Sequence, residues 1–590
     1  MKIKDSLAVY AYYDPEGEWT DEASFYINYL SQIFEEIIIV SNSKLVNFPL
    51  KNKRNISLME RENKGFDFGA WKDAILSRGE NFLLNLDYLC LCNSSVFGPI
   101  GDLSHTFKYA EQKNWSFWGL TEHPKAAGVD YHIQSYFMVF RKGLLQRREF
   151  FRFWKEMEYS KTWKDTVQRH EIPMTKAMLN MGAKVGAVFT FPELSKKEPN
   201  PLLLYAPETI QAGLPFLKKK VFTEPYDYFF SRGDGKEALF SYELIKKTNP
   251  LLANLILDYL SHKVRPSRLR EGLHNTVILP TQYPTSFPRS PLPLKAGVVF
   301  YVFYEDLFDY SSLILSQLDI NLEICIVSSK PHLLQRYRKK FQKDSRFIFR
   351  AMENRGRNEA AFFVICKDLI QNWDVTCFLH DKKTGHGPHP HVGETWMKFC
   401  ISNLFASNSF ILNVITLFSK NPKLGMLLPP PPLFGPLSSS ILQNPWGRNR
   451  QQATRLINAL KLKNFLDDDP VAPFGGMFWL RKEAISNFLE LDLHQQDYPP
   501  EPVEDDGTFL HALERMYAQI VQSNEYLSQW VLAIDYAPVY IDNLYFLLKK
   551  KSRPLENLRH LFVANIRKIL INNPRLYELA KRLYRALTSN

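Results

Sequence analysis

The chain lacks any apolar run of the roughly 18 to 20 residues that a membrane-spanning helix needs. Its longest candidate, FILNVITLF (410–418), is short enough to be a buried element. The six cysteines stand within apolar segments and show neither zinc-site nor disulfide spacing. The N-terminus reads as a first strand, because Asp5 interrupts it and no cleavage-site pattern follows. We therefore expect a cytosolic chain that does not cross a membrane.

What is present is the composition of a large folded protein. The 590 residues are 45% hydrophobic and 14% aromatic, which suits about three or four domain-sized units. Aromatic rings serve packed cores and also sugar-binding clefts, where they lie against pyranose faces. The net charge of +12 raises the possibility of nucleic-acid binding, but no nucleic-acid motif accompanies it. We expect no nucleic-acid partner.

One sequence unit occurs twice, which predicts two similar domains. ENKG at 62–65 returns as ENRG at 353–356, 291 residues later. YLCLCNSS (88–95) aligns with VTCFLHDK (375–382), so that Ser94 corresponds to Asp381. SYFMVFRK resembles GGMFWLRK at a larger offset, so we expect an insertion in the second copy near 404–470.

Each copy alternates β-branched apolar runs with segments of helical period. That alternation is typical of an α/β fold with a mostly parallel sheet. Five prolines between 280 and 293 indicate an extended linker. The expected organisation is a first domain at 1–265, a proline-rich linker at 266–295, a second domain at 296–548 and a tail at 549–590.

The repeated NKG and NRG loops are candidate binding sites, because ligands of parallel sheets bind beyond the carboxyl ends of the strands. Tight turns alone would explain Gly65 and Gly356. The loops also carry side chains suited to a ribose, a base edge or a pyrophosphate: Asn63, Asp67, Asn354 and Arg357. We interpret both loops, glycines included, as donor-binding.

A second candidate site follows the strand that ends in LHDKKTG. A diphosphate leaving group needs its charge neutralised, by a carboxylate-held divalent metal or by lysines. Asp381, with His380 beside it, could hold the metal, and Lys382 could neutralise the charge directly. The alternative is a solvated polar loop. The first copy has Asn93 and Ser94 at these positions, so it lacks the metal carboxylate.

A third candidate site is EPVEDDGTFLHALER (501–515). Asp506 and Glu501 are the expected catalytic acids, with His511 and Arg515 one helical turn apart as donor-binding groups. The alternative is a helix cap with favourable dipole placement. The first copy offers only Glu171 as an analogous acid.

Together these residues resemble the rhamnan synthesis protein F family, bacterial enzymes of rhamnose-containing polysaccharide assembly. The matching stretches are RENKGFDFGAWKDAI, NSSVFGP, FWGLTE, HIQSYFMVF, ENRGRNEAAFF, LHDKKT, GGMFWLRKEA and EPVEDDGTFLHALER. The resemblance extends to about residue 548. It implies GT-A glycosyltransferase domains, a nucleotide-activated donor (dTDP-rhamnose), a lipid-linked glycan acceptor, and a divalent cation, Mg²⁺ or Mn²⁺, at Asp381.

The chain departs from the family pattern at three positions. The pattern has Asp where this chain has Ser94, Asp where it has Asn358, and Pro where it has Ala361. The loss at 94 favours a second copy that alone is catalytic over a first copy that works without metal. A different class of protein, a non-catalytic glycan-binding or assembly protein built from degenerate transferase folds, is the alternative.

The tail at 549–590 is strongly basic, with eleven Lys and Arg against two acids. Its leucines recur at helical spacing, which predicts a pair of basic amphipathic helices on an anionic membrane surface. Docking of the same helices onto the second domain is the alternative. We expect a peripheral protein at the inner face of the cell membrane.

Overall fold

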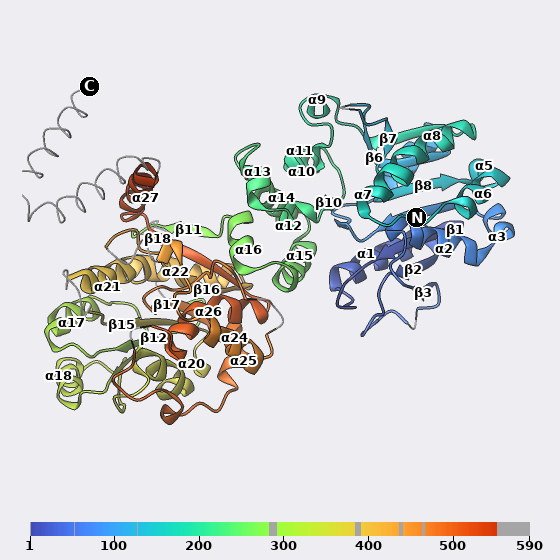
Figure 1. The fold of residues 1–590 in the computed structure, drawn as a ribbon. Coiled ribbons are helices and arrows are strands. Elements are labelled where there is room, and N and C mark those ends of the chain that lie inside the picture. Colours follow the sequence, from blue (N-terminus) through green and yellow to red (C-terminus); the bar gives the residue numbers. More distant parts are fainter. Residues whose placement is uncertain are drawn as a thin grey trace, which may run out of the picture.

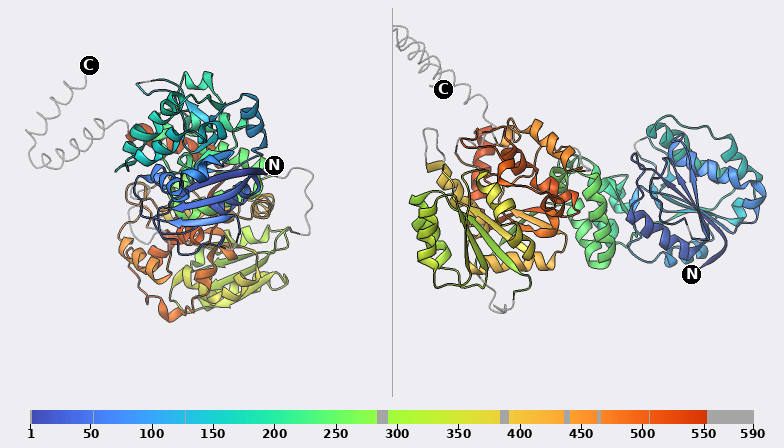
Figure 2. Two further views of the ribbon diagram at one scale, coloured as in Figure 1. Left: turned by 90° about the vertical axis from the view of Figure 1, so that its right-hand side faces the viewer. Right: turned by 90° about the horizontal axis from the view of Figure 1, so that it is seen from below.

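The computed structural model describes residues 2–551, with gaps at 52, 127, 283–291, 384–390, 436–440, 463–465 and 505. Two α/β domains lie at opposite ends of the molecule, with a helical segment between them (Figures 1 and 2). The amphipathic helices predicted for the tail lie, beyond residue 551, outside the described residues.

The first domain is built on a sheet with the strand order β3-β2-β1-β4-β8-β6-β7, in which β9 also pairs with β6. The four parallel strands are β1 (Ile3–Tyr12), β2 (Phe34–Ser41), β3 (Ile56–Glu60) and β4 (Tyr88–Asn93). The others are β8 (Phe137–Arg141), antiparallel to β4 and β6, and β6 (Phe117–His123), β7 (His132–Ile133) and β9 (Val185–Phe189).

Helices cover both faces of this sheet, so its strands are apolar on both sides. Successive residues of β1 alternate between the two cores: Tyr10 packs with Tyr26 of α1, and Val9 with Trp71 of α2. The covering helices are α1 (Asp21–Ile33), α2 (Phe66–Arg78), α3 (Glu80–Leu84), α4 (Ser104–Gln112), α5 (Lys142–Leu145), α6 (Arg148–Glu156), α7 (Trp163–Thr166), the π-helix η1 (Val167–Glu171) and α8 (Ile172–Asn180).

The second domain repeats this strand order. Its sheet runs β14-β13-β12-β15-β17-β16-β18-β11, with β17 antiparallel to both neighbours and every other pair parallel. The strands are β11 (Thr276–Leu279), β12 (Ala296–Tyr301), β13 (Glu323–Ser328), β14 (Phe347–Ala351), β15 (Val375–His380), β16 (Leu424–Leu428), β17 (Phe478–Arg481) and β18 (Leu527–Ala533). The predicted α/β class with two mostly parallel sheets is confirmed.

Helices also cover both faces of the second sheet (Figure 1). Those before β16 are η2 (Glu305–Leu307), α17 (Phe308–Ser316), α18 (Pro331–Phe341), α19 (Arg357–Ala360), η3 (Ala361–Ile365), α20 (Lys367–Asn372), α21 (His391–Leu404) and α22 (Asn408–Lys420). Those after it are α24 (Arg450–Ala459), η4 (Lys482–Ile485), α25 (Ser486–Leu489), η5 (Gln495–Asp497), α26 (Phe509–Ser523) and α27 (Ala537–Lys551).

The segment between the sheets is helical and has an apolar core of its own. It comprises α9 (Pro192–Ser195), α10 (Pro201–Leu204), α11 (Ala206–Gln211), the short strand β10 (Leu217–Lys218), α12 (Lys220–Thr223), α13 (Tyr226–Phe230), α14 (Glu237–Thr248), α15 (Pro250–Lys263) and α16 (Pro266–Gly272). Lys263 forms an ion pair with Asp14 of the first domain, and Gln522 of the second donates to the carbonyl oxygens of Ser261 and Val264. This segment is therefore packed against both domains.

Two predicted boundaries need correction. Residues 266–279 are not linker, because they form α16 and then β11, which adds a strand to the second sheet beside β18. Within the predicted insertion at 404–470, β16 pairs with β17 as β6 pairs with β8. Strand β16 therefore belongs to the repeated unit, and the additional residues of the second copy lie before and after it.

Among the described residues, no single helix has the length and apolarity to cross a membrane. Helices α21 and α22, which are bent 62° to each other, are together long and apolar enough, by length and composition alone.

Candidate functional site

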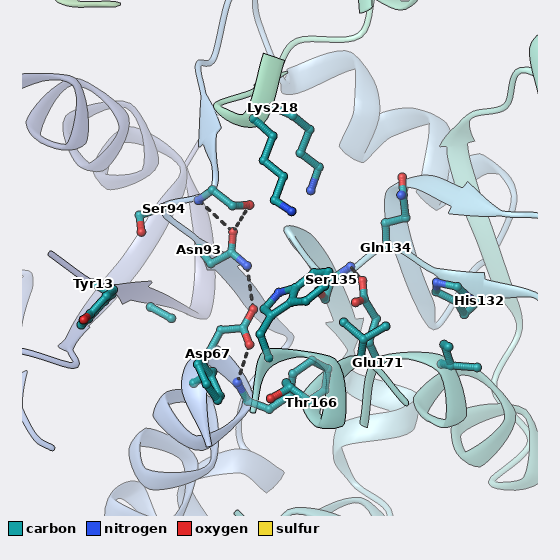
Figure 3. A pocket seen from close by; sticks show the side chains of 18 of the residues that line it. Tyr13, Asp67, Asn93, Ser94, His132, Gln134, Ser135, Thr166, Glu171 and Lys218 are labelled. Carbon is teal, nitrogen blue, oxygen red and sulfur yellow. Dashed lines mark hydrogen bonds between the residues drawn. The ribbon is translucent and has the colours of Figure 1, made fainter. Parts of the chain in front are cut away.

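A cavity of about 560 Å³ opens in the first domain where the parallel strands end. Tyr13 follows β1, Asn93 ends β4 and Ser94 follows it, and Asn63 precedes α2; all four line the cavity, together with Asp67. Figure 3 shows Tyr13, Asp67, Asn93 and Ser94 around the opening. Asn63 and Asp67, predicted to bind the donor, thus face one cavity; their donor-binding role stays a prediction.

Gly65 and Gly356 have the same backbone role in the two domains. Their φ angles are +71° and +78°, in the left-handed region, and each immediately precedes a helix. A Cβ atom on Gly65 would lie 2.9 Å from Tyr159, and one on Gly356 would lie 2.5 Å from Ala360. Backbone conformation and close packing account for both glycines.

Asp67 stands at the start of α2 and faces the cavity. Its Oδ2 atom accepts a hydrogen bond from Asn93 Nδ2 at 2.8 Å, and its Oδ1 atom accepts one from the Phe68 N–H at 3.0 Å. Burial, and then the negative charge of Glu171, raise the pKa of Asp67 to about 6, in spite of these hydrogen bonds. A carboxyl group with this pKa can exchange a proton near neutral pH.

Glu171 reaches the cavity from the other side (Figure 3). It is the last residue of the π-helix η1, and π-helical turns often occur at functional sites. Its Oε1 atom accepts a hydrogen bond from the Ser135 N–H at 2.9 Å. The sequence suggested Glu171 only as an analogue of the acids at 501–506; the structure places it with Asp67.

Lys218 enters the same cavity from β10 (Figure 3). Its ammonium group lies 4.1 Å from the centroid of the Tyr136 ring. Burial lowers the pKa of Lys218 to about 8, opposed by the charges of Glu171 and Asp67. This lysine lies outside the repeated motifs, in the helical segment between the two sheets, so the repeat does not reveal it.

Aromatic and imidazole rings form the remaining wall of the cavity. The rings of His123 and His132 are stacked with centroids 5.0 Å apart. Trp163 is 60% exposed, and the ammonium group of Lys220 lies 4.7 Å from its ring centroid. Flat rings beside polar groups suit the binding of a sugar ring.

In the second domain, Asp381 occupies the position of Ser94. The Asp381 N–H donates to the Tyr301 carbonyl, just as the Ser94 N–H donates to the Ala11 carbonyl. Asp381 Oδ2 accepts from the N–H groups of Phe303 and Tyr304, both at 2.7 Å, whereas its buried Oδ1 has no hydrogen-bond partner among the described residues. Burial raises the pKa of Asp381 to about 7.

This orphaned oxygen fits one position in the shell of a divalent cation, since Mg²⁺ often takes one or two carboxylates plus substrate phosphates. His380 does not fit the metal role predicted for it. Its Nδ1 lies 2.8 Å from the Asp381 carbonyl oxygen and its Nε2 lies 2.6 Å from that of Gly475, so neither nitrogen is turned to a metal. The described residues contain no group of three or more His, Cys, Asp or Glu able to hold a metal.

Glu501 and Arg357 are occupied by each other. Arg357 donates from Nε to Glu501 Oε1 at 2.7 Å and from Nη2 to Oε2 at 3.1 Å. The Val503 N–H also donates to Glu501. The hydrogen bonds from Arg357 lower the pKa of Glu501, which weakens it as a base. In this arrangement Arg357 is not free to bind a donor phosphate, so both predicted roles require the pair to open.

Asp506 is also held by protein groups. Its Oδ2 atom accepts from the Arg448 N–H at 2.9 Å and its Oδ1 atom from Asn449 Nδ2. Burial opposes ionisation of Asp506, but these hydrogen bonds outweigh it and lower the pKa. The contacts give Asp506 a structural role; its catalytic role stays a prediction.

The other predicted donor-binding residues of this domain are spread over its strand ends. His511 Nδ1 lies 2.8 Å from Thr508 Oγ1, and Arg515 donates to the Pro445 and His511 carbonyl oxygens at 2.7 and 2.8 Å. The ammonium group of Lys382 lies 4.8 Å from the centroid of the Trp396 ring. Asn354 is exposed on its loop. Each of the first three side chains thus has a protein contact of its own, and the donor-binding role of all four stays a prediction.

Glu514 is the second-domain counterpart of Glu171. The motifs in the sequence did not point to Glu514. Phe117 pairs with Val185 in the first sheet, as Met426 pairs with Ser528 in the second. The helices before these strands end at Asn180 and Ser523, so both comparisons give an offset of 343 residues (528 − 185 and 523 − 180). The same offset takes Glu171 to Glu514.

The family of the chain follows from a match along most of its length. The family model of rhamnan synthesis protein F matches residues 37–526. The chain therefore belongs to the rhamnan synthesis protein F family, as its motifs predicted. Membership supports a glycosyltransferase of polysaccharide synthesis.

Two curated relatives share part of the chain. The uncharacterized protein y4gN of Sinorhizobium fredii is 23% identical over 236 residues, which cover 39% of this chain and 56% of the relative. The uncharacterized protein WxcX of Xanthomonas campestris pv. campestris (strain B100) is 24% identical over 222 residues, which cover 38% of this chain and 30% of the relative. The match thus spans about half of one relative and under a third of the other.

Two solved structures show a distant likeness. A mannosyltransferase from Pyrobaculum calidifontis, PcManGT in complex with GDP-Man and Mn²⁺, has 10% identity over 50% of this chain and 68% of that one, with a TM-score of 0.22. The apo-form glycosyltransferase GlyE of Streptococcus pneumoniae TIGR4 is 12% identical. The likeness covers 63% of this chain and 84% of that one, with a TM-score of 0.23. Both TM-scores are too low to support an inference about this chain.

Proposed function

We propose that the chain is a glycosyltransferase of polysaccharide synthesis and that its first-domain cavity binds a nucleotide-activated sugar. The observation that carries this proposal is the pair Asp67 and Glu171, beside Lys218, in a cavity of about 560 Å³ at the strand ends. This volume is in the range of small-molecule sites. Glycosyl transfer needs a base for the acceptor hydroxyl and stabilisation of the leaving diphosphate, and these residue types can supply both.

Each residue then has a separate role. Asp67, held by Asn93, accepts hydrogen bonds from donor hydroxyl groups, together with Asn63. Glu171 is the general base. The acceptor sugar lies against His132 and Trp163, because His132 is on the Glu171 side of the cavity (Figure 3) and the exposed Trp163 ring, which also lines the cavity, offers an aromatic surface.

Family membership is the basis for the donor and acceptor that we propose. For a rhamnan synthesis family member we propose dTDP-rhamnose as donor and a lipid-linked glycan as acceptor. In the second domain we propose a Mg²⁺ or Mn²⁺ site at Asp381 Oδ1, which is the orphaned oxygen there. When bound, the cation would neutralise a donor diphosphate.

Membrane association is a separate part of the proposal. The helix α27 exposes Ile541, Leu544, Tyr545 and Leu548, each between 44% and 59%, at i, i+3, i+4 and i+7 spacing. This apolar stripe leads into the basic sequence that begins at 549. It supports a peripheral position on the anionic inner face of the cell membrane. Sedimentation with anionic and neutral vesicles, comparing the full chain with the variant Leu544→Ser/Leu548→Ser, tests it: equal binding of both proteins removes α27 from the proposal.

Incubation of the full chain with labelled dTDP-rhamnose and other sugar nucleotides tests the enzymatic proposal. We expect release of the nucleoside diphosphate, or transfer to an added glycan, and loss of both in Asp67→Asn. Asn is a suitable replacement because the second domain carries Asn358 at the equivalent position. The absence of turnover with every donor and acceptor tried would contradict the proposal.

The second candidate is a glycan-binding or assembly protein without turnover. The observation in its favour is that Arg357 and Glu501 satisfy each other in the second domain, as expected of a disused site. Glycan binding by the full chain, with no consumption of any sugar nucleotide, would establish this function instead.

A further inference from the structure

The first domain has lost the carboxylate that could hold a metal. Ser94 and Asp381 occupy equivalent backbone positions, each donating its N–H to the carbonyl at the end of the neighbouring strand. A serine hydroxyl is a poor substitute for a carboxylate as a ligand of Mg²⁺ or Mn²⁺. A donor diphosphate in this domain therefore needs another source of positive charge.

Lys218 is fixed beside that position by backbone hydrogen bonds. Its strand β10 pairs antiparallel with β5 (Val96–Phe97), directly after Ser94, and Lys218 lies opposite Val96. The next residue, Lys219, donates its N–H to the Ser95 carbonyl at 3.0 Å. The peptide that carries Lys218 is thus held against the end of β4, where the second domain has its aspartate.

Three consecutive lysines occur here, and only the first points into the cavity without an acidic partner. Lys219 forms a buried ion pair with Glu22, and Lys220 lies over Trp163 and within 3.4 Å of Glu224. Among the described residues, no carboxylate lies within ion-pair distance of the Lys218 ammonium group. In Figure 3 its side chain extends into the cavity opposite Asp67 and Glu171.

We propose that Lys218 binds the diphosphate of the donor in the first domain and so replaces a metal ion there. This inference rests on the proposed function and specifies its chemistry. During transfer, the bond from the anomeric carbon to the diphosphate oxygen breaks and its electron pair stays with that oxygen. The acceptor oxygen forms the new bond to the anomeric carbon, and its proton passes to the Glu171 carboxylate. Lys218 stabilises the negative charge that develops on the diphosphate.

The environment of Lys218 is consistent with this role. Burial lowers its pKa, so the ammonium group has lost hydration that an anion would replace. The cation–π contact with Tyr136 holds the charge without neutralising it. In the second domain, β18 is followed by α27 rather than by a strand like β10, so among the described elements this lysine has no counterpart.

The test is calorimetric binding of dTDP to the full chain in excess EDTA. We expect wild-type protein to bind, Lys218→Met to bind at least about tenfold more weakly, as for loss of a charge-assisted contact, and Lys218→Arg to recover most of the affinity. Lys236→Met is the matched control, because Lys236 lies exposed in the same segment and pairs with Asp234. It should bind as wild type does.

Binding separates this inference from the proposed function. If wild type binds dTDP only with added Mg²⁺ or Mn²⁺, or if Lys218→Met binds normally in EDTA, the inference is overturned even when the chain transfers sugar. If no sugar is transferred but binding in EDTA depends on Lys218, the inference stands without the enzymatic proposal. Should Lys218→Met lower the melting temperature markedly, Lys218→Gln in the same assay replaces it.

Discussion

The strand-end sites of the two domains differ at two equivalent positions. The first has Asp67 and Glu171 but Ser94 in place of the strand-end aspartate, whereas the second has Asp381 but Asn358 in place of Asp67. The surroundings of the strand end differ between the two domains. The first domain brings Lys218 to the gap, while the second buries a carboxylate that has one oxygen without a partner. The two copies of the fold thus differ in the groups available for charge neutralisation at this position.

The domains also differ in how far their polar groups are already committed. In the first, Lys218, Asp67 and Glu171 surround an open cavity. In the second, Arg357 and Glu501 are paired across 144 residues of sequence, in a contact that closes the residues 498–503 over the loop at 353–357. Under our proposal a ligand can enter the first domain directly, whereas in the second it would have to displace contacts within the protein.

The largest expected effect is on catalysis by the first domain. Glu171→Gln should lower the rate of transfer by about 100-fold or more, the usual range for loss of a general base, with dTDP binding retained. The matched variant is Glu514→Gln, at the equivalent position of the second domain. If the two variants lose activity equally, or only Glu514→Gln does, the assignment of transfer to the first domain fails.

A smaller effect is expected on metal binding by the second domain. Asp381→Asn should remove Mn²⁺ binding measured by electron paramagnetic resonance in the presence of dTDP, because Asp381 Oδ1 is the carboxylate oxygen proposed as ligand. Asp67→Asn should leave Mn²⁺ binding unchanged. Retention of Mn²⁺ in Asp381→Asn would show that the metal lies elsewhere.

A third effect, on stability, has a defined pH window. The folded pKa of Asp67, about 6, is above the ordinary value of about 3.9, so the native state retains a proton that the unfolded chain has lost between these values. The group therefore costs stability as pH rises through this window, and the cost persists above it. Asp67→Asn should raise the melting temperature of the first domain by a few degrees at pH 7.5 and leave it unchanged at pH 4. Equal shifts at both pH values would contradict this.

The smallest effect is expected for the ion pair of the second domain. Arg357→Met should lower the free energy of unfolding by about 1 kcal/mol or less, because the pair is partly exposed and such pairs contribute little. Denaturant unfolding of Arg357→Met and Glu501→Gln provides the measurement. A loss of several kcal/mol in either variant would mean that this contact holds the domain together.

Residues inside the repeat could be predicted from the sequence. The correspondence of Ser94 with Asp381, and of Gly65 with Gly356, follows from matching motifs at nearly equal offsets of 287 and 291 residues, and the structure places each pair equivalently. Glu514 was missed because insertions on both sides of β16 change the offset to 343 residues, which only strand register reveals.

Residues whose role depends on distant partners could not be predicted in this way. Glu501 and Asp506 stand in a motif rich in acids, but whether they are free depends on Arg357 and Asn449, which the chain brings to them from far away in the sequence. Lys218 belongs to a segment that has no counterpart among the described elements of the second copy, so its place beside Ser94 follows only from the pairing of β10 with β5.

The most direct test of the account is an experimental structure of the full chain with dTDP bound in the presence of EDTA. The account predicts the diphosphate in the first-domain cavity, within ion-pair distance of the Lys218 ammonium group, with the nucleoside towards Asn63 and Asp67. A diphosphate found only beside Asp381, with the first-domain cavity unchanged, would contradict it.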